Sequence, residues 1–197
     1  KRKIDFFIIG AQKSGTTSLC EYLRFFPEIR LPFINEPKVF TDDDLFRGFP
    51  DNIHNFYDLN FLDDSIIGMK DVGILFQHSK TAERIYRYNS EAKIVIMLRD
   101  PIKRAFSAYN FARKNQRESE DSFIKAINDR EREHLNYRDQ LLLNYMLVSD
   151  YYKQIKTFYS KFPSNQIHIC IMEEFIENKV FEFNKILSFL GVKDKNY

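Results

Sequence analysis

The segment DFFIIGAQKSGTTSLCEYLRFF, residues 5–26, joins an apolar run to a helical pattern through a loop of small residues. Residues 5–9 predict a buried strand, because they form a short apolar run that ends at a glycine. Residues 18–26 carry apolar side chains at helical spacing, and Pro27 is expected to end that helix. A strand, a loop and a helix in this order form the unit from which α/β folds with parallel sheets are built.

The loop at residues 10–17, GAQKSGTT, has the composition of an anion-binding turn. Small side chains let the backbone approach a phosphate group closely. The amides at the start of the following helix carry partial positive charge and point toward such an anion. We therefore expect this loop to hold a phosphate group.

The same loop departs from the pattern G-x-x-x-x-G-K-[ST] of nucleotide hydrolases. Gly10 and Gly15 have the required separation, and Thr17 fills the Ser/Thr position. Thr16 stands where the lysine should be, and Lys13 comes earlier, inside the loop. A lysine at that earlier position favours a group shorter than a triphosphate, such as a phosphosulfate.

A second strand–helix unit follows at residues 93–111. Its first part, KIVIML, predicts a strand from its β-branched residues and its length. Asp100 and Pro101 predict the start of a helix, with aspartate as N-cap and proline in the first helical position. Arg99 would present a forked cationic donor at the end of the strand, and Ser107 a hydroxyl on the flank of the helix.

Further strands and helices alternate along the chain, and we predict them from apolar runs and amphipathic spacing. They are strands at residues 66–75 and 166–172 and helices at residues 79–88, 145–162 and 180–190. This order predicts an α/β fold, P-loop-like, with a central parallel sheet flanked by helices. No linker divides the chain, so we expect one domain over residues 1–197.

Three other features of the sequence have structural interpretations. The stretch at residues 116–139 is mostly charged and predicts a solvated helix. In the helix of the second unit, Lys103 is expected to be solvated, and the role of Arg104 stays open. Cys20 and Cys170 are interpreted as buried thiols, because they form neither a disulfide framework nor a metal-binding pattern.

Composition excludes several classes of function. Hydrophobic residues make up 44% of the 197 residues and charged residues 29%, a balance typical of a soluble globular domain. The net charge of +2 is too small for a general polyanion binder, so nucleic acid is not an expected partner. No apolar run approaches the roughly 18 residues of a membrane-spanning helix. The default location is therefore cytoplasmic, with the Golgi lumen as the alternative if a membrane anchor precedes the sequence.

Both strand–helix units resemble signatures of sulfotransferases that use 3′-phosphoadenosine 5′-phosphosulfate (PAPS). The run QKSGTTSL resembles the 5′-phosphosulfate loop of that family, and the segment ending in RDPIKRAFSAYNF resembles its 3′-phosphate motif. The resemblance implies that Lys13 stabilises the leaving phosphate and that Arg99 and Ser107 hold the 3′-phosphate. It also implies a set of loop residues that hold the 5′-phosphosulfate: Ser14, Gly15, Thr16, Thr17 and Ser18.

A third segment, INEPKVF at residues 34–40, resembles the KEPxFF segment of heparan-sulfate-type and related bacterial sulfotransferases. The glutamate of that motif is the family's general base, which implies the same role for Glu36. Asn35 replaces the lysine of the motif, while Lys38 is close enough in sequence to hold Glu36 ionised or to contact the donor.

The acceptor side matches the family more loosely. GMKDVGIL at residues 68–75 stands where heparan-type enzymes carry a GEKxPxY-like segment, so Lys70 is expected to line the acceptor cleft. Other sulfotransferases use a histidine base, but none of the four histidines here lies in a matching segment. Of His54, His78, His134 and His168, only His78 is kept as a reserve candidate.

We therefore expect a sulfotransferase that moves a sulfuryl group from PAPS to a hydroxyl or amine, releases PAP and requires no metal. A carbohydrate is the first expected acceptor and a small metabolite the second. Two alternatives stay open: a P-loop kinase that binds Mg²⁺ through Asp100, and a non-catalytic nucleotide-binding domain of the same fold. The resemblance ends at GVKDKNY, so the chain is expected to lack the family's C-terminal segment, a basic loop that completes the nucleotide site.

Overall fold

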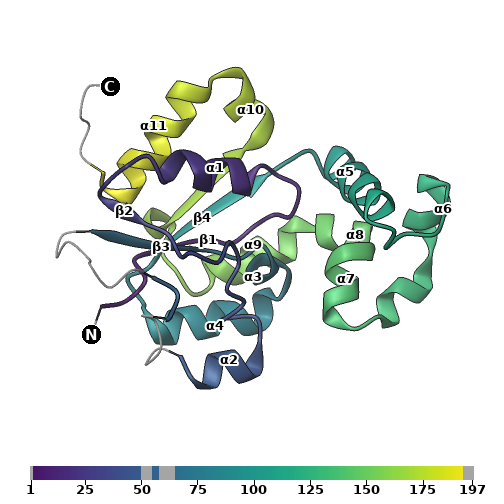
Figure 1. Ribbon diagram of the computed structural model, residues 1–197, viewed down its shortest axis with the longest axis horizontal. Helices are drawn as coiled ribbons and strands as arrows, with labels where there is room; N and C mark the ends of the chain where they lie inside the picture. The colour runs from purple at the N-terminus through teal and green to yellow at the C-terminus, as the bar shows by residue number, and fades with distance from the viewer. Residues whose placement is uncertain (1, 50–54, 58–64, 193–197) are drawn as a thin grey trace.

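The computed structural model describes residues 2–49, 55–57 and 65–192, and His54 and the residues after Val192 lie outside these ranges. In the described chain, five parallel strands form one sheet in the order β2-β3-β1-β4-β5 (Figure 1). The strands are β1 (Phe6–Ile8), β2 (Ile29–Arg30), β3 (Ile66–Lys70), β4 (Lys93–Leu98) and β5 (Ile167–Ile171). This arrangement confirms the predicted α/β class with a central parallel sheet.

The sheet is built around β1, whose residues pair with β3 on one side and with β4 on the other. Phe7, for example, lies between Met69 and Ile94. The chain runs from β1 to the β2–β3 side and then crosses to β4, so the strand order reverses between β1 and β4. In open α/β sheets, ligands bind at the carboxyl ends of the strands at such a reversal.

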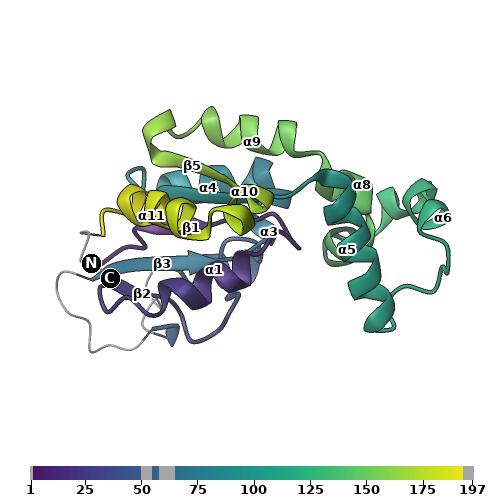
Figure 2. The ribbon, with the colours of Figure 1, turned by 90° about the horizontal axis from the view of Figure 1, so that it is seen from above.

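Helices cover both faces of the sheet, as Figures 1 and 2 show. One face carries α1 (Thr16–Leu23), α10 (Met172–Glu177) and α11 (Lys179–Leu190). The other carries α2 (Asp43–Arg47), α3 (Gly73–Phe76), α4 (His78–Tyr88) and α9 (Tyr151–Tyr159). Alternate strand residues feed the two apolar cores: Phe6 and Ile8 pack with the first group of helices, Phe7 and Ile9 with the second.

A lobe of helices extends from the carboxyl edge of the sheet (Figures 1 and 2). It contains α5 (Pro101–Lys114), α6 (Phe123–Asn128), the 3₁₀ turn Arg130–His134, α7 (Tyr137–Leu143) and α8 (Tyr145–Ser149). The lobe has a small apolar core of its own, in which Ala105, Ala108, Tyr109, Ala126 and Tyr145 are buried.

The prediction of one solvated helix over residues 116–139 is wrong. The segment folds as α6, the 3₁₀ turn and the start of α7, and two of its charged side chains are buried. Arg132 Nη1 lies 2.6 Å from Glu118 Oε2, and the hydroxyl of Tyr145 donates to the same carboxylate at 2.7 Å. The segment was predicted from its charge, but a buried ion pair and Ser122 and Asn136 as helix caps organise it instead.

Other predicted elements needed smaller corrections. The strand expected at residues 66–75 ends at Lys70, because the backbone turns into α3. The helix expected at residues 18–26 ends at Leu23, and the helix expected at residues 145–162 is divided into α8 and α9. The strand at residues 93–98 and the helix that ends before Gly191 are confirmed, Gly191 having the left-handed φ of 88° that suits a C-terminal cap.

Three predictions about single residues can also be compared with the structure. Cys20 and Cys170 are buried, free thiols, as predicted. Lys103 is exposed, as predicted, whereas Arg104 is fully buried and donates to Ser149 Oγ at 2.6 Å and to the Tyr145 carbonyl at 2.7 Å. Within the described residues, no helix combines the length and the apolar character that crossing a membrane requires.

Candidate active site

The loop between β1 and α1 forms the predicted anion cradle at the carboxyl edge of the sheet. Gly15 precedes α1 with a φ of 83°, a left-handed conformation that favours glycine. No side chain caps α1, so the amides of its first turn are not occupied by a capping group. An anion at this helix end would be stabilised both by these amides and by the helix dipole.

Lys13 projects from the cradle toward α5. Its ammonium lies 4.1 Å from the centre of the Phe111 ring, a cation–π distance. Burial, and then the positive charge of Arg99, lower the pKa of Lys13. The backbone here has a positive φ of 67°, so the loop holds Lys13 in a conformation that few non-glycine residues adopt.

Arg99 lies beside this cradle, because β4 is the immediate neighbour of β1. Arg99 follows the last residue of β4, and its Nη1 donates to the Lys13 carbonyl at 3.3 Å. Its own carbonyl accepts from the hydroxyl of Tyr151 at 3.1 Å, which fixes the turn. Ser107 lies on α5, half-buried. The structure therefore brings the phosphosulfate loop and Arg99 into direct contact.

Asp100 caps the helix that carries Ser107. Its Oδ1 accepts from the Lys103 amide at 2.8 Å, and Pro101 occupies the first turn, as predicted. The Asp100 amide in turn donates to both carboxylate oxygens of Glu173, at 3.3 and 3.4 Å. Glu173 thus anchors the start of α5 to α10.

Glu36 lies between two lysines. Lys38 Nζ is 2.7 Å from Glu36 Oε2, and Lys70 Nζ is 3.0 Å from Glu36 Oε1. Lys70 is almost fully buried at the end of β3 and also donates to Thr17 Oγ1 at 3.2 Å. The same lysine therefore contacts both the predicted base and the first turn of α1.

The charge state of Glu36 follows from its surroundings. Burial opposes ionisation and by itself would raise the pKa of Glu36. The ammonium groups of Lys38 and Lys70 outweigh that effect, so the pKa of Glu36 is below its usual value. At neutral pH, Glu36 is a carboxylate, which is the form that accepts a proton.

Sequence reasoning missed the importance of Asp71, the residue after β3. Its side chain is 1% exposed, and its Oδ1 lies 3.0 Å from Lys38 Nζ. Lys38 therefore bridges two carboxylates, Glu36 and Asp71. The position of Asp71 directly after a buried parallel strand was a usable signal, because side chains there face the binding edge of the sheet.

The reserve candidate His78 has its own partners away from Glu36. His78 begins α4, and its Nδ1 lies 2.8 Å from Thr157 Oγ1 on α9. Burial lowers the pKa of His78, although the charge of Asp150 opposes the shift. These contacts belong to the packing of α4 against α9.

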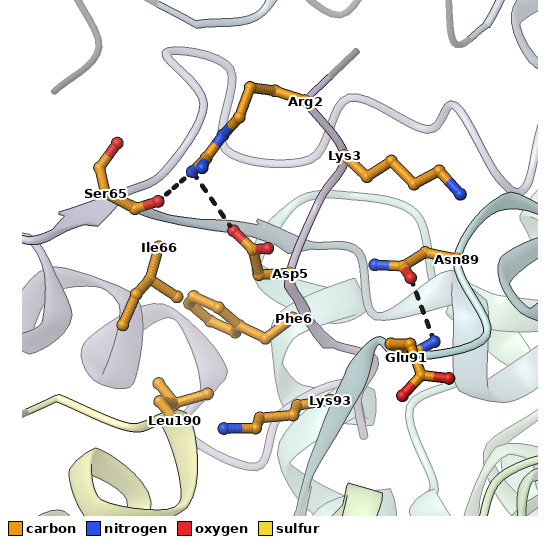
Figure 3. A pocket seen from close by; sticks show the side chains of 10 residues that line it. All are labelled: Arg2, Lys3, Asp5, Phe6, Ser65, Ile66, Asn89, Glu91, Lys93 and Leu190. Atoms are coloured by element: carbon orange, nitrogen blue, oxygen red, sulfur yellow. Dashed lines mark hydrogen bonds and ion pairs between the residues drawn. The ribbon is translucent and has the colours of Figure 1, made fainter. Parts of the chain in front are cut away.

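A cavity of about 650 Å³ lies outside this cluster, at the opposite edge of the sheet, where β1, β3 and β4 begin. None of the predicted site residues lines it (Figure 3). Its charged residues have mixed signs, with Arg2 3.7 Å from Asp5.

Across residues 2–49, 55–57 and 65–192, no group of three or more His, Cys, Asp or Glu side chains could hold a metal ion.

Comparison with known proteins places this arrangement among sulfotransferases. The family model described as "Sulfotransferase domain" matches residues 3–196. Carbohydrate sulfotransferase 15 of Mus musculus is 22% identical over 95% of this chain and 43% of its own length. Heparan sulfate glucosamine 3-O-sulfotransferase 3B1 of Homo sapiens is 26% identical over 94% of this chain and 45% of its own length. The chain thus spans less than half the length of these two relatives.

Solved structures agree with the sequence relatives. A sulfotransferase from Alicyclobacillus acidocaldarius superposes with a TM-score of 0.84 and 31% identity, over 98% of this chain and 83% of that one. A mouse sulfotransferase complexed with PAP superposes with a TM-score of 0.64 and 17% identity, over 99% of this chain and 60% of that one, which shows a shared fold.

Proposed function

We propose, because this chain belongs to the sulfotransferase domain family, that it transfers a sulfuryl group from PAPS to a hydroxyl or amine acceptor. PAPS supplies the activated sulfuryl group, and PAP is the leaving product. The protein supplies an anion cradle, a lysine beside it and a carboxylate on the acceptor side. The relative complexed with PAP shares this fold, which supports the nucleotide assignment.

The donor site is proposed from the cradle and its neighbours. The uncapped amides of α1 and the loop residues Ser14 to Ser18 would hold the 5′-phosphosulfate. Arg99 and Ser107 would hold the 3′-phosphate from the adjacent strand–helix unit. Arg99 already contacts the loop carbonyl of Lys13, so the two halves of the site need no large movement to bind one nucleotide.

The proposed chemistry is an in-line transfer. Glu36 removes the proton of the acceptor, and the acceptor oxygen or nitrogen forms a bond to sulfur. The bond between sulfur and the phosphate oxygen breaks, and Lys13 stabilises the negative charge that develops on that oxygen. Lys38 and Lys70 keep Glu36 ionised before the transfer, as their contacts with its carboxylate suggest.

The observation that carries this proposal is the position of Lys70. A single buried ammonium contacts Thr17 of the donor loop and Glu36 on the acceptor side. A scaffold domain would gain little from it, because burying a lysine costs free energy that its partners must offset. A catalytic site gains from it, since the sulfuryl group must travel between the two regions that Lys70 joins.

The kinase alternative has less support. It required Asp100 as a ligand of Mg²⁺, but the Asp100 carboxylate is engaged as the cap of α5. The contacts of Asp100 therefore favour sulfuryl transfer over the kinase reaction.

A carbohydrate is the acceptor class that we propose, because both curated relatives are named as sulfotransferases of carbohydrates. The test incubates purified protein with ³⁵S-labelled PAPS and a panel of heparan sulfate oligosaccharides, chondroitin oligosaccharides and glucosamine. We expect label in at least one oligosaccharide. Label in glucosamine alone would move the assignment to small metabolites, and no transfer to any of them would contradict the carbohydrate proposal.

A further inference from the structure

Asp71 is a buried carboxylate that the reaction described above does not use. It directly follows β3 and has three hydrogen-bond donors around it. Lys38 Nζ lies 3.0 Å from Oδ1, the Gly73 amide donates to Oδ1 at 2.9 Å, and the Thr41 hydroxyl donates to Oδ2 at 2.8 Å. Both oxygens are therefore fixed, and the carboxylate cannot rotate away from Lys38 without losing these bonds.

A hydroxyl from the helical lobe closes the site around Asp71. The Tyr137 Oη on α7 is buried beside Gly73. It lies so close that a Cβ at position 73 would clash with it. Asp71 Oδ1 and the Thr41 methyl group surround the same point, at 3.1 and 3.3 Å from the position of a Cβ on Gly73. Burial, and then the negative charge of Asp71, raise the pKa of Tyr137, so the phenol is protonated at neutral pH. Because the Asp71 side chain is only 1% exposed, its attraction for Lys38 is stronger than it would be in water.

The backbone of Lys38 is strained. Its φ is 61°, a left-handed conformation that is unfavourable for a residue with a Cβ. The Lys38 carbonyl accepts from the amides of Thr41 and Asp42 at 3.1 and 2.8 Å, which stabilises the turn. Such strain is usual where neighbouring structure determines the position of a functional residue.

We propose that Asp71 is a positioning residue, which holds Lys38 against Glu36 and so fixes the carboxylate that deprotonates the acceptor. This inference rests on the proposed function for its catalytic consequence, but not for its structural part. Lys38 bridges the two carboxylates at 2.7 and 3.0 Å. Asp71 is 1% exposed and is fixed by two further donors, Gly73 and Thr41, whereas Glu36 is 24% exposed and has one, Lys70. Asp71 is therefore the anchor, Lys38 the link and Glu36 the reacting group.

The structural part is tested by the reactivity of the Lys38 amine, which needs no acceptor. Lys80 is a matched control, because its side chain is 36% exposed against 39% for Lys38 and it pairs with the exposed Asp43. Competitive labelling with acetic anhydride, followed by mass spectrometry, should show Lys38 reacting more slowly than Lys80. Asp71→Asn should raise the labelling of Lys38, by about tenfold for each unit by which the pKa of its ammonium falls, and leave Lys80 unchanged.

Control variants keep this test decisive. Asp43→Asn should raise the labelling of Lys80 and not that of Lys38. If Asp71→Asn fails to fold, Thr41→Val removes one of the bonds that orient Asp71 and should raise Lys38 labelling to a smaller extent. Unchanged Lys38 labelling in the folded Asp71→Asn protein would overturn the proposal.

The catalytic part is tested by a double-mutant cycle, with the panel oligosaccharide that gives the highest turnover as acceptor. Asp71→Asn should lower kcat roughly tenfold, within the range for directly coupled residues, and leave the Kd of PAP unchanged. In a Lys38→Met background, Asp71→Asn should have no further effect, because Asp71 acts through Lys38. Asp43→Asn should leave kcat unchanged. An equal loss of kcat in both backgrounds would contradict the link, whereas inactivity of the unmutated protein would count against the proposed function and leave the labelling result to decide the position of Lys38.

Discussion

At the scale of single residues, the site concentrates charge around Glu36. Two lysines contact one carboxylate, and the nearer of them is shared with the buried Asp71. A carboxylate in such a place is a weaker base than a free one, because its pKa is lowered. It is also ionised at neutral pH, so a group that can accept a proton is present before the acceptor binds.

The proposed base can be tested by an isosteric change. Glu36→Gln should lower kcat by roughly 10²-fold or more, the usual scale for the loss of a general base. The Kd of PAP should change little, because Glu36 lies on the acceptor side of Lys70. Steady-state kinetics and calorimetry measure the two quantities, and near-normal turnover in the variant would exclude Glu36 and make His78 the next residue to test.

The pH profile tests the charge state of the same residue. Burial by itself would raise the pKa of Glu36, but Lys38 and Lys70 lower it, so the acid limb of kcat/KM should lie below the usual pKa of a glutamate. Lys38→Met removes one of the lowering contributions, and the limb should move to higher pH. Lys80→Met, which alters a lysine of similar exposure, should not move it. A limb that stays in place in Lys38→Met would show that Lys38 does not set the ionisation of Glu36.

Sequence alone named Lys13, Glu36 and Arg99 as candidates, because each lies in a short segment that resembles a family motif, and the structure places Arg99 against the carbonyl of Lys13. Sequence was not sufficient for Asp71, whose partners Lys38 and Thr41 lie about 30 positions earlier. It also missed the Tyr137 hydroxyl, which reaches Gly73 from a different lobe. Contacts between segments depend on packing, which spacing along one segment does not encode.

At the scale of elements, α5 links the end of β4 to the rest of the helical lobe. Its first turn is fixed by Asp100 and Glu173, and its buried Arg104 binds Ser149 and the Tyr145 carbonyl of α8. Arg99 precedes this helix and Ser107 lies on it. The start of α5 therefore determines where the proposed 3′-phosphate ligands are placed.

The cap of α5 provides a prediction that also tests whether Asp100 is a metal ligand, as the kinase hypothesis requires. Asp100→Ala should lower the free energy of unfolding by about 1 kcal/mol, the usual cost of removing an N-cap. Asp100→Asn should keep both stability and transfer, because asparagine also caps helices. Thermal melts and the sulfur-transfer assay test this. A stable Asp100→Asn protein that has lost activity would contradict this, because it would show that the Asp100 carboxylate has a role beyond capping, as a metal ligand would.

The charged segment at residues 116–139 shows where element prediction failed. Its charges predicted exposure, but Glu118 and Arg132 neutralise each other inside the lobe, and Tyr145 completes the pair. Pairing of this kind is decided by residues 14 positions apart and by a third residue from another helix. The strands at the centre of the sheet were predicted more accurately, because burial on both faces leaves a continuous apolar run in the sequence.

At the scale of the whole molecule, the loops after β1, β3 and β4 converge where the strand order reverses. The first provides the cradle, the second Asp71, directly after Lys70 at the end of β3, and the third Arg99. The cavity at the opposite edge shares none of these residues. The parallel sheet thus gathers, at one edge, residues that lie almost 90 positions apart in the sequence, as the contact between Arg99 and Lys13 shows.

The proposed mechanism assigns every charge-stabilising role to protein side chains and amides. Transfer from PAPS should therefore persist after dialysis against EDTA, and added Mg²⁺ should not increase kcat by more than a small factor. The assay uses the same labelled donor with and without the chelator. Activity that disappears with EDTA and returns with Mg²⁺ would contradict this assignment, because it would show that the transfer needs a metal ion.

The central claim is that the nucleotide site recognises a 3′-phosphate, and calorimetry with PAP and adenosine 5′-phosphate tests it most directly. A charge-assisted contact from Arg99 should contribute about 1.5–3 kcal/mol, or roughly 10- to 150-fold in affinity. PAP should therefore bind more tightly than adenosine 5′-phosphate by about that factor in the natural protein that contains residues 1–197. Arg99→Ala should remove most of the difference and leave the affinity for adenosine 5′-phosphate nearly unchanged. Equal affinity of the unmutated protein for the two nucleotides would contradict the assignment.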